Sequence, residues 1–298
     1  MRECSLPGVS PTFVERAKTI LACPICKTQD WRYSQSVRRA PISKCAHCGL
    51  LGTTAFVEGR STTEELYETP PEHYAWYRQH YLRSRLLVYA RMMPRLDRFR
   101  QNGCLLEIGC SYGDFLGVAR AAGWDAKGVE ISTYASQVAC SRGFTVYRDC
   151  GRELPLRPGS LDVIAMWDVI EHLTDVGEII EQCVALLRPG GALIARTPDA
   201  RALQGTTGFL GAAYRHLAYP ANTPEHVFHF TPETLSLLLT QKGFQVIETD
   251  TSGEWEERPV SGGSPFVRFG RYLVLRHAYA KGLPYEFVIT AIKERSNE

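Results

Sequence analysis

The stretch LLEIGCSYGDFL, residues 105–116, decides the fold. An apolar run ends at Glu107, and the turn that follows places Gly109 and Gly113 on either side of Ser111. Glycine allows a backbone to approach a ligand closely and to adopt angles that a side chain disfavours. A dinucleotide-binding turn would read G-x-G-x-x-G, whereas this one reads G-x-S-x-G-D and follows a carboxylate. The turn therefore favours a ligand with a cationic end over a pyrophosphate.

Strand and helix signals alternate from residue 103 onward. Short apolar runs are separated by segments of helical period, several of which stop at glycine, and this alternation predicts repeated β-α-β units. Such units build a mainly parallel, doubly wound α/β sheet, whose ligands bind past the carboxyl ends of the strands. The expected strands are 104–109, 126–131, 144–149, 161–169, 192–197, 244–249 and 285–293.

Three acids end three successive strands at that ligand edge. Glu107 ends the first, Glu130 ends the second, where a carboxylate can take a ribose diol, and Asp149 ends the third. A single acid is more often a solvated loop residue. Three at consecutive strand ends favour a ligand role, with Asp149 within reach of an adenine amino group.

Two pairs of cysteines predict a metal site before the sheet. Cys23, Cys26, Cys45 and Cys48 form C-x2-C, eighteen residues, C-x2-C, which closes a tetrahedral Zn²⁺ site. Four thiolates leave no open position, so we expect a structural metal that lets a short segment fold. A redox pair is disfavoured because no βαβ unit is readable there, and His47 replacing one cysteine is the less favoured ligand set.

The helical segments carry further signals. Apolar residues at steps of three and four predict a helix over 72–96, which Pro94 should kink or end. The tyrosine- and tryptophan-rich start of this helix either packs between the cysteine segment and the sheet or forms part of a lid facing the substrate. A helix over 176–187 should stop at Pro189-Gly190-Gly191, and another should begin after Thr231, with Pro232 in its first position.

Charge and hydropathy limit the partners. The net charge of +2 creates no strong field for nucleic acid, so a nucleic-acid partner is disfavoured. The first residues lack a signal-peptide core, and no run approaches the roughly 20 apolar residues of a membrane span. We therefore expect a cytoplasmic protein, and the sequence does not indicate its oligomeric state.

The motifs LLEIGCSYGDFL, GVEIS, MWDVIEHL and LRPGGALIARTPD resemble class I S-adenosylmethionine-dependent methyltransferases over roughly residues 103–292. The last two resemble the branch that includes ubiquinone-pathway O-methyltransferases and natural-product and sugar methyltransferases. The resemblance implies a Rossmann-like, seven-stranded sheet, parallel except for its last strand. Together with the cysteine spacing and the helical pattern, it gives an expected division into a zinc module over 18–56, a helical connector over 57–101 and a methyltransferase domain over 102–298.

The resemblance also implies a site for S-adenosylmethionine. Glu107 would hold the amino group of the ligand, residues 109–113 would wrap its methionine part, and Glu130 would hold the ribose. Ser111 departs from the glycine that the family most often has. The implied set of cofactor-binding residues is Glu107, Gly109, Cys110, Ser111, Gly113, Glu130, Ile131, Asp149, Cys150, Trp167, Asp168 and Val169.

Deprotonation of an acceptor needs a base, and histidine has a suitable pKa. His226, in PEHVFHF, follows the fifth strand at the ligand edge, and His172, in DVIEHL, is either a base or a residue that orients the cofactor loop. The segment PEHVFHF and the zinc module resemble deoxysugar C-methyltransferases in part. Glu225 could raise the basicity of His226, and Tyr81 could act with it. Residues 205–224 are interpreted as a lid.

Three functions remain open on the sequence. The first is a methyltransferase acting on a hydroxyl or activated carbon of a sugar, lipid-linked or natural-product acceptor. The second is an RNA methyltransferase whose zinc module grips nucleic acid, although WDVI stands where an N-P-P-Y-like segment would be expected. The third is a non-catalytic protein that keeps the fold for interaction, against which the three strand-end acids argue.

Overall fold

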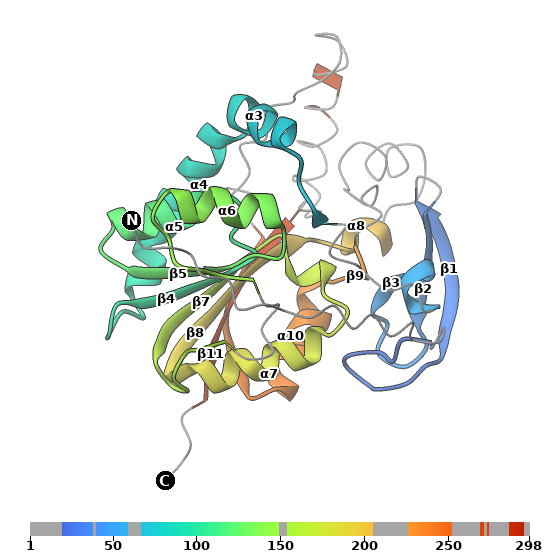
Figure 1. The fold of residues 1–298 in the computed structure, drawn as a ribbon. Coiled ribbons are helices and arrows are strands. Elements are labelled where there is room, and N and C mark those ends of the chain that lie inside the picture. The colour runs from blue at the N-terminus through green and yellow to red at the C-terminus, as the bar shows by residue number, and fades with distance from the viewer. Residues whose placement is uncertain are drawn as a thin grey trace.

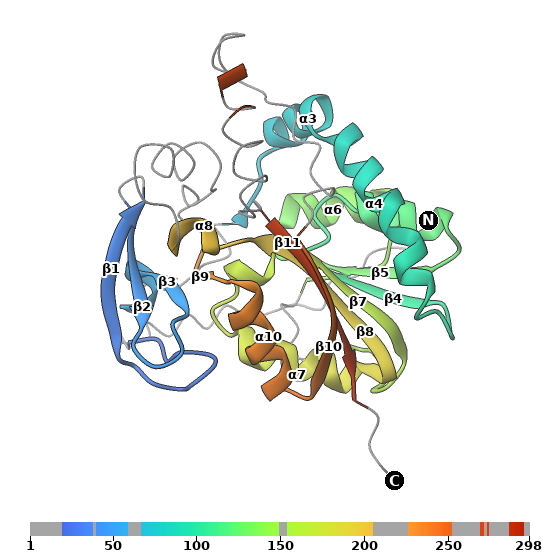
Figure 2. The ribbon, with the colours of Figure 1, turned by 180° about the vertical axis from the view of Figure 1, so that it is seen from behind.

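The computed structural model describes residues 20–37, 40–58, 67–148, 154–204, 226–251, 269–270, 273 and 286–294 of the 298. Two sheets organise these residues, and they lie side by side in the two opposite views of Figures 1 and 2. No helix within the described ranges is long and apolar enough to cross a membrane.

The larger sheet has seven strands in the order β10-β11-β8-β7-β4-β5-β6. All neighbours pair in parallel except β11, which runs antiparallel to both β8 and β10, so the predicted sheet is confirmed. The central strand β7 is buried along its whole length, as expected for a parallel strand covered on both faces. The strands are β4 (Cys104–Ile108), β5 (Asp125–Val129), β6 (Val146–Tyr147), β7 (Leu161–Trp167), β8 (Leu187–Pro198), β10 (Phe244–Asp250) and β11 (Glu286–Lys293).

Helices cover both faces of this sheet (Figures 1 and 2). One face packs against α4 (Leu82–Asp97), α5 (Asp114–Ala121) and α6 (Thr133–Ser141), and the other against α7 (Val176–Leu186) and α10 (Pro232–Gln241). Each helix presents an apolar stripe to the sheet, which is how an amphipathic helix is stabilised in a folded chain. The helices thus leave the carboxyl ends of the strands as the edge where ligands bind.

The smaller sheet has the order β1-β2-β3-β9. Strands β1 (Trp31–Val37), β2 (Ala40–Cys45) and β3 (Leu51–Thr53) belong to the cysteine segment and are followed by α1 (Thr54–Val57). Strand β9 (Phe228–His229) comes from the segment after the fifth strand of the large sheet, and it pairs antiparallel with β3. The sequence did not predict this pairing, because a strand of two residues has no periodicity to detect.

Three helix boundaries differ from the sequence expectation. The stretch predicted as one helix over 72–96 is divided into α3 (Pro71–His80) and α4, with Tyr81 between them. Pro94 does not end α4, which continues to Asp97 because Met92, Met93 and Leu96 are buried around it. Helix α7 ends at Leu186, before Pro189-Gly190-Gly191, and those three residues already belong to β8.

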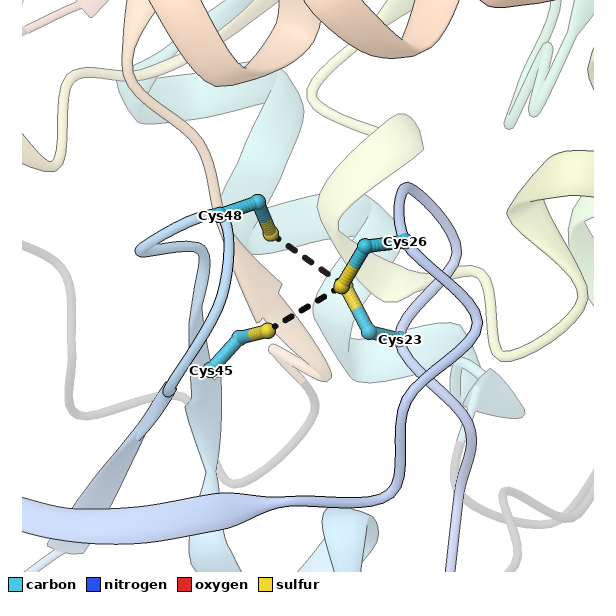
Figure 3. A group of neighbouring side chains, drawn as sticks. All are labelled: Cys23, Cys26, Cys45 and Cys48. Carbon is cyan, nitrogen blue, oxygen red and sulfur yellow. Dashed lines mark hydrogen bonds between the residues drawn. The ribbon is translucent and has the colours of Figure 1, made fainter.

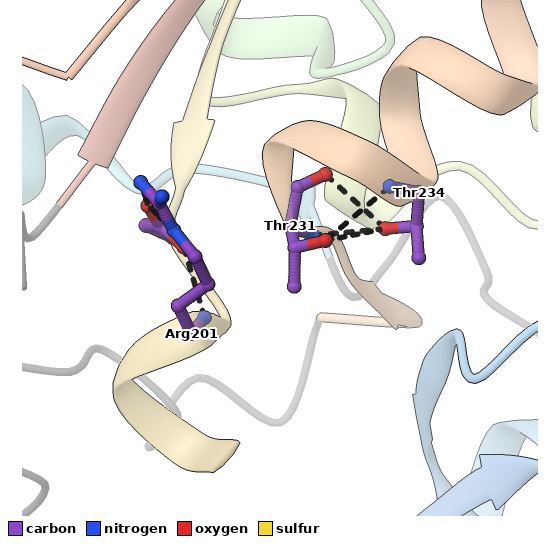
Figure 4. A network of polar contacts seen from close by, with 4 residues as sticks. Arg201, Thr231 and Thr234 are labelled. Carbon is purple, nitrogen blue, oxygen red and sulfur yellow. Dashed lines mark hydrogen bonds and ion pairs between the residues drawn. The ribbon is translucent and has the colours of Figure 1, made fainter. Parts of the chain in front are cut away.

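The helix expected after Thr231 is confirmed. The Thr231 hydroxyl accepts a bond from the Thr234 N–H at 3.3 Å, and the Thr231 N–H donates to the Thr234 hydroxyl at 2.9 Å (Figure 4). This reciprocal capping box satisfies backbone donors at the start of α10, with Pro232 in the first turn. Beside it, Arg201 at the start of α8 (Arg201–Gln204) is bonded to the carboxylate of Asp199.

Candidate functional site

Every second residue of the glycine turn between β4 and α5 has a left-handed φ angle. Gly109, Ser111 and Gly113 have φ angles of +74°, +46° and +77°. A Cβ at Gly109 would clash with the side chain of Val169, so only glycine lets the turn lie against the end of β7. Ser111 adopts a region that non-glycine residues disfavour, which is the physical reason for glycine at this position in the resembling family.

Glu130 ties this turn to the end of β5. Its carboxylate accepts the Ser111 N–H at 2.7 Å and the Ser132 N–H at 2.8 Å. Burial raises the pKa of Glu130, and the bonds from Ser132 and Ser111 oppose that rise. The acid predicted to bind a ribose is therefore held rigidly beside the turn.

Glu107 lies at the end of β4 with 2 % of its surface exposed. Among the described residues, its Oε2 atom has no hydrogen-bond partner. Burial raises its pKa well above the usual value, and the nearby Asp114 and Glu130 add to the rise. A ligand with a cationic amino group would remove both penalties, so these residues fit S-adenosylmethionine.

Asp168 has the left-handed φ of +57° and lies between two arginines. It forms an ion pair with Arg85 from α4 at 2.9 Å and a second, short one with Arg196 from β8. Arg196 is buried, with 3 % of its surface exposed. Its guanidinium also lies 3.8 Å from the carboxylate of Glu286. The sequence indicated neither arginine as a partner of Asp168, because the three lie on different elements.

Trp167, the last residue of β7, is a packing residue in the structure. Its ring lies 5.2 Å from Phe115 and 5.7 Å from Tyr89, between α5 and α4. Cys110, within the turn, is buried, and its backbone N–H donates to Val129 O. The carbonyl of Ile131 accepts a bond from the guanidinium of Arg148. A role for Trp167, Cys110 or Ile131 in holding the donor stays a prediction.

Aromatic residues of α3 pack on the glycine turn. Tyr74 and Tyr77 lie 4.4 and 5.5 Å from the ring of Tyr112, whose hydroxyl is bonded to His73 at 2.9 Å. These side chains therefore contact the turn that is predicted to hold the donor, and a role of this helix in a lid that faces the substrate stays a prediction. Tyr81 lies at the junction of α3 and α4, with its ring 5.0 Å from Trp76.

Two histidines distant in the sequence meet beyond the end of β7. His172 ends the 3-10 helix η1 (Ile170–His172), and His226 precedes β9. Their ring centroids are 4.7 Å apart, with the planes at 83°. The backbone N–H of His172 donates to the carbonyl of Val169. The side chain of Val169 lies against Gly109, so the two histidines are adjacent to the turn that is predicted to hold the donor.

Glu171 completes this histidine cluster. One carboxylate oxygen of Glu171 and one ring nitrogen each of His172 and His226 lie within 4.8 Å of one another. Burial, with Asp168 second, raises the pKa of Glu171 to about 8. Sequence reasoning missed Glu171, although its place next to His172 in DVIEHL was a signal that could have identified it.

The small sheet holds the segment that carries His226. The Thr53 hydroxyl donates to His226 O at 2.7 Å and lies 3.0 Å from His229 Nε2. The backbone N–H of Val227 donates to Glu171 O at 2.8 Å, so the peptide unit that joins His226 to Val227 is held at both its carbonyl and its N–H. Burial and the nearby His172 lower the pKa of His229 to about 4, which keeps that ring neutral.

The four predicted metal ligands converge (Figure 3). All four Sγ atoms lie within 4.8 Å of one another, and the pairs Cys23–Cys48 and Cys26–Cys45 are each 3.4 Å apart. A tetrahedron with Zn–S bonds of about 2.3 Å has edges of about 3.8 Å, so the four thiols fit Zn²⁺ after a small expansion. His47 is exposed and is not part of the cluster.

Some predicted site residues lie outside the described ranges. These are Asp149 and Cys150 of the cofactor set, Glu225 of the catalytic set, and the segment 205–224 interpreted as a lid. Their roles remain predictions.

Comparison with known proteins shows a family match over most of this fold. Residues 71–249 match the family described as "Methyltransferase domain". The ubiquinone biosynthesis O-methyltransferase of Cupriavidus pinatubonensis is 28% identical over 151 residues, which cover 48% of this chain and 61% of that protein. The enzyme of the same name from Paraburkholderia phymatum is 30% identical over 139 residues, 44% of this chain and 60% of that one. The match thus spans less than two thirds of these relatives.

Solved structures share the fold. A SAM-dependent methyltransferase from Archaeoglobus fulgidus superposes with a TM-score of 0.52 at 21% identity, covering 74% of this chain and 99% of that one. The geranyl diphosphate C-methyltransferase of Streptomyces coelicolor A3(2) has a TM-score of 0.52 at 14% identity, covering 68% of this chain and 79% of that one. At these identities the likeness concerns the fold alone.

Proposed function

The chain belongs to the methyltransferase-domain family, and on this premise we propose that it transfers a methyl group from S-adenosylmethionine to a small-molecule acceptor. The acceptor carries a hydroxyl or an activated carbon and is a sugar, a lipid-linked compound or a natural product. A histidine base takes its proton. The two O-methyltransferase relatives support transfer to oxygen.

The donor is held by the turn and the acids around it. Glu107 pairs with the amino group, because its buried Oε2 has no hydrogen-bond partner among the described residues. Glu130 accepts the ribose hydroxyls, and Gly109 lets the backbone lie close to the ligand. When bound, S-adenosylmethionine supplies an electrophilic methyl group on a sulfonium.

The single observation that carries the proposal is the meeting of His172 and His226 beside the glycine turn. Methyl transfer requires the nucleophile in line with the methyl group, and it requires a base for the proton that the nucleophile loses. The histidine cluster lies beyond the end of β7, at the edge where the donor is expected. His226 is the proposed base, and His172 is the alternative.

The proposal is tested with His226→Ala. We expect this variant to lower methyl transfer by roughly 10²–10⁴-fold, as for loss of a general base, with adenosylmethionine affinity nearly unchanged. The assay follows S-adenosylhomocysteine release with a panel of phenols, nucleotide sugars and lipid-linked polyols, and calorimetry measures donor affinity on the same preparation. His80→Ala is the control, because His80 is exposed on α3.

The paired measurement separates three outcomes. Normal turnover by His226→Ala would demote His226 to packing and leave His172 as the candidate base. Loss of turnover together with donor binding would show a structural role. A wild-type protein that binds the donor but methylates no member of the panel would count against the small-molecule assignment.

A further inference from the structure

We propose that Glu171 is the carboxylate partner of His172 and His226, and that the three side chains act as one proton acceptor. The inference rests on the proposed function for the use of the proton, and it goes beyond it by replacing Glu225 with a different acid. Glu171 is a positioning residue here, since it acts on the acceptor through an imidazole.

The carboxylate of Glu171 is buried beside both histidines. Glu171 has 1 % of its surface exposed, and one of its carboxylate oxygens lies within 4.8 Å of a ring nitrogen of each histidine. Thr197 on β8 donates its hydroxyl to Oε2 at 2.9 Å, which fixes the orientation of the group. Among the described residues, the other oxygen, Oε1, has no hydrogen-bond partner. A carboxylate oxygen buried in that state is costly unless a cation or a proton comes to it.

Glu171 also holds the segment that carries His226. The backbone carbonyl of Glu171 accepts the Val227 N–H at 2.8 Å, next in sequence to His226. Glu171 therefore sets the position of His226 with its backbone and offers it a carboxylate with its side chain. A base whose orientation is set by a buried acid is a common arrangement in enzymes that remove a proton.

The net charge of the three side chains favours uptake of a proton. An ionised Glu171 with two neutral imidazoles carries one negative charge, and uptake of one proton makes the cluster neutral. A buried site favours that change, whereas two imidazoles alone would become positive. The surrounding charges are Asp168, which raises the pKa of Glu171, and Arg196, which lowers it, together with Arg85, which is paired with Asp168. The imidazole of His229, 6.0 Å from that of His226, is the neighbouring neutral titratable group.

Proton removal accompanies methyl transfer to the acceptor. The acceptor O–H or C–H bond breaks, and its proton moves to a ring nitrogen of His226 or His172. The electron pair left on the acceptor forms the new bond to the methyl group, while the sulfonium takes back the electrons of its S–CH₃ bond and leaves as neutral S-adenosylhomocysteine. The imidazolium is then stabilised by Glu171, and the proton later passes to solvent.

This assignment has a consequence for pH. The ionised cluster is the active form, and the pKa of Glu171 is raised to about 8, mainly by burial. Methyl transfer should therefore rise with pH and level off above about pH 8.

The first experiment needs no acceptor. Ring nitrogen and carbon shifts of the histidines are titrated by NMR in full-length, zinc-loaded protein, in the wild type, Glu171→Gln, Glu171→Asp and the control Glu178→Gln on the exposed face of α7. We expect Glu171→Gln to weaken proton binding at His172 and His226 at least tenfold, with Glu171→Asp intermediate and His80 unchanged. Equal titration of both histidines in the wild type and Glu171→Gln overturns the proposal.

The second experiment uses turnover. Glu171→Gln should lower kcat/KM roughly 10²-fold and abolish the rise near pH 8, while donor affinity stays the same and Glu171→Asp restores part of the activity. A pH profile that keeps its rise in Glu171→Gln contradicts the proposal. So does metal analysis that finds a second metal ion lost on changing Glu171 or His226, because the cluster would then hold a cation.

The two experiments separate the failures. If no acceptor in the panel is methylated, the proposed function is contradicted, but the effect of Glu171 on the histidine titration can still be measured. If the histidine titration does not change in Glu171→Gln, only the present inference is contradicted. If Glu171→Gln does not fold, the wild type decides. Its histidine shifts must show an additional inflection near pH 8, and a titration without it overturns the proposal.

Discussion

Glu130 shows at the scale of one residue how the same atoms can serve the fold and a ligand. Its carboxylate accepts the N–H groups of Ser111 and Ser132, which holds the glycine turn against β5. A carboxylate offers about four lone-pair sites, so it can keep these two bonds and still accept two ribose hydroxyls. The two backbone bonds are therefore compatible with the predicted contact to the ribose.

Replacing Glu130 by alanine should weaken S-adenosylmethionine binding by roughly 1–3 kcal/mol, because hydrogen bonds to a charged group are lost on both the ligand and the turn. Calorimetry on the variant measures the affinity, and Glu178→Ala, exposed on α7, is the matched control. Unchanged affinity would show that the donor site has been assigned to the wrong place.

At the scale of elements, the pairing of β3 with β9 decides where His226 lies. Leu51 pairs with His229 and Gly52 with Phe228, and the ring of Phe228 stacks on Trp31 at 6.3 Å. The cysteine segment thus contacts the histidine cluster through Thr53, in addition to carrying the four predicted metal ligands. Two segments that appear as separate units along the chain are one structural unit in space (Figure 1).

Thr53→Val tests this coupling. The valine keeps the shape but removes the hydroxyl that donates to His226 O and contacts His229 Nε2. We expect a loss of about 1–3 kcal/mol of unfolding free energy from the buried acceptor left without its donor. Methyl transfer should fall at constant donor affinity, with both properties kept in Thr53→Ser.

The control for Thr53 is its neighbour. Thr54→Val removes a hydroxyl that is bonded to the Ser43 hydroxyl at 2.9 Å, whereas the hydroxyl bonded to His226 O belongs to Thr53. If Thr53→Val and Thr54→Val behave alike in turnover, then β3 does not position His226, and the coupling through the small sheet is wrong.

At the scale of the whole molecule, one apolar core joins the cysteine cluster to the large sheet. The same cluster of buried residues contains Cys23, Leu50, Phe228, Leu235 and Ile289, from both sheets and from α10. A core that is shared in this way favours a single cooperative unfolding transition. Loss of the metal should then be felt throughout the chain.

The zinc prediction belongs to this scale. Protein prepared without chelator should contain about one Zn per chain, and its removal should lower the unfolding temperature by on the order of 10 °C in a single transition. Burial opposes ionisation of the Cys45 thiol, but the backbone N–H groups of Cys48 and His47, together with the thiols of Cys26 and Cys48, lower its pKa to about 7. Burial raises the pKa of the Cys23 and Cys48 thiols, so their ionisation needs the positive charge of the metal.

Calorimetry and metal analysis check this prediction on the wild type, Cys45→Ser and the control Cys104→Ser, whose thiol lies outside the cluster. Absence of metal in the wild type would contradict the closed site. A separate early transition confined to Cys45→Ser would show that the two sheets unfold independently and that the common core does not couple them.

The sequence alone determined what local patterns encode. The spacing of the four cysteines, the alternation of strand and helix, the glycine turn with Glu107 and Glu130, and the cap at Thr231 each depend on residues close together in the chain. Backbone angles, helix periods and capping bonds act over a few residues, so they can be read from a few residues.

Only the tertiary structure decided which distant groups meet. The sequence indicated His172 and His226 as rival bases, yet it could not show that the two rings meet and that the carboxylate of Glu171 lies near both. Nor could it show that Asp168 pairs with both Arg85 and Arg196, or that β9 joins the sheet of the cysteine segment. These contacts depend on how loops close and how strand edges pair, and a two-residue strand or a single buried acid leaves no periodic trace in a sequence.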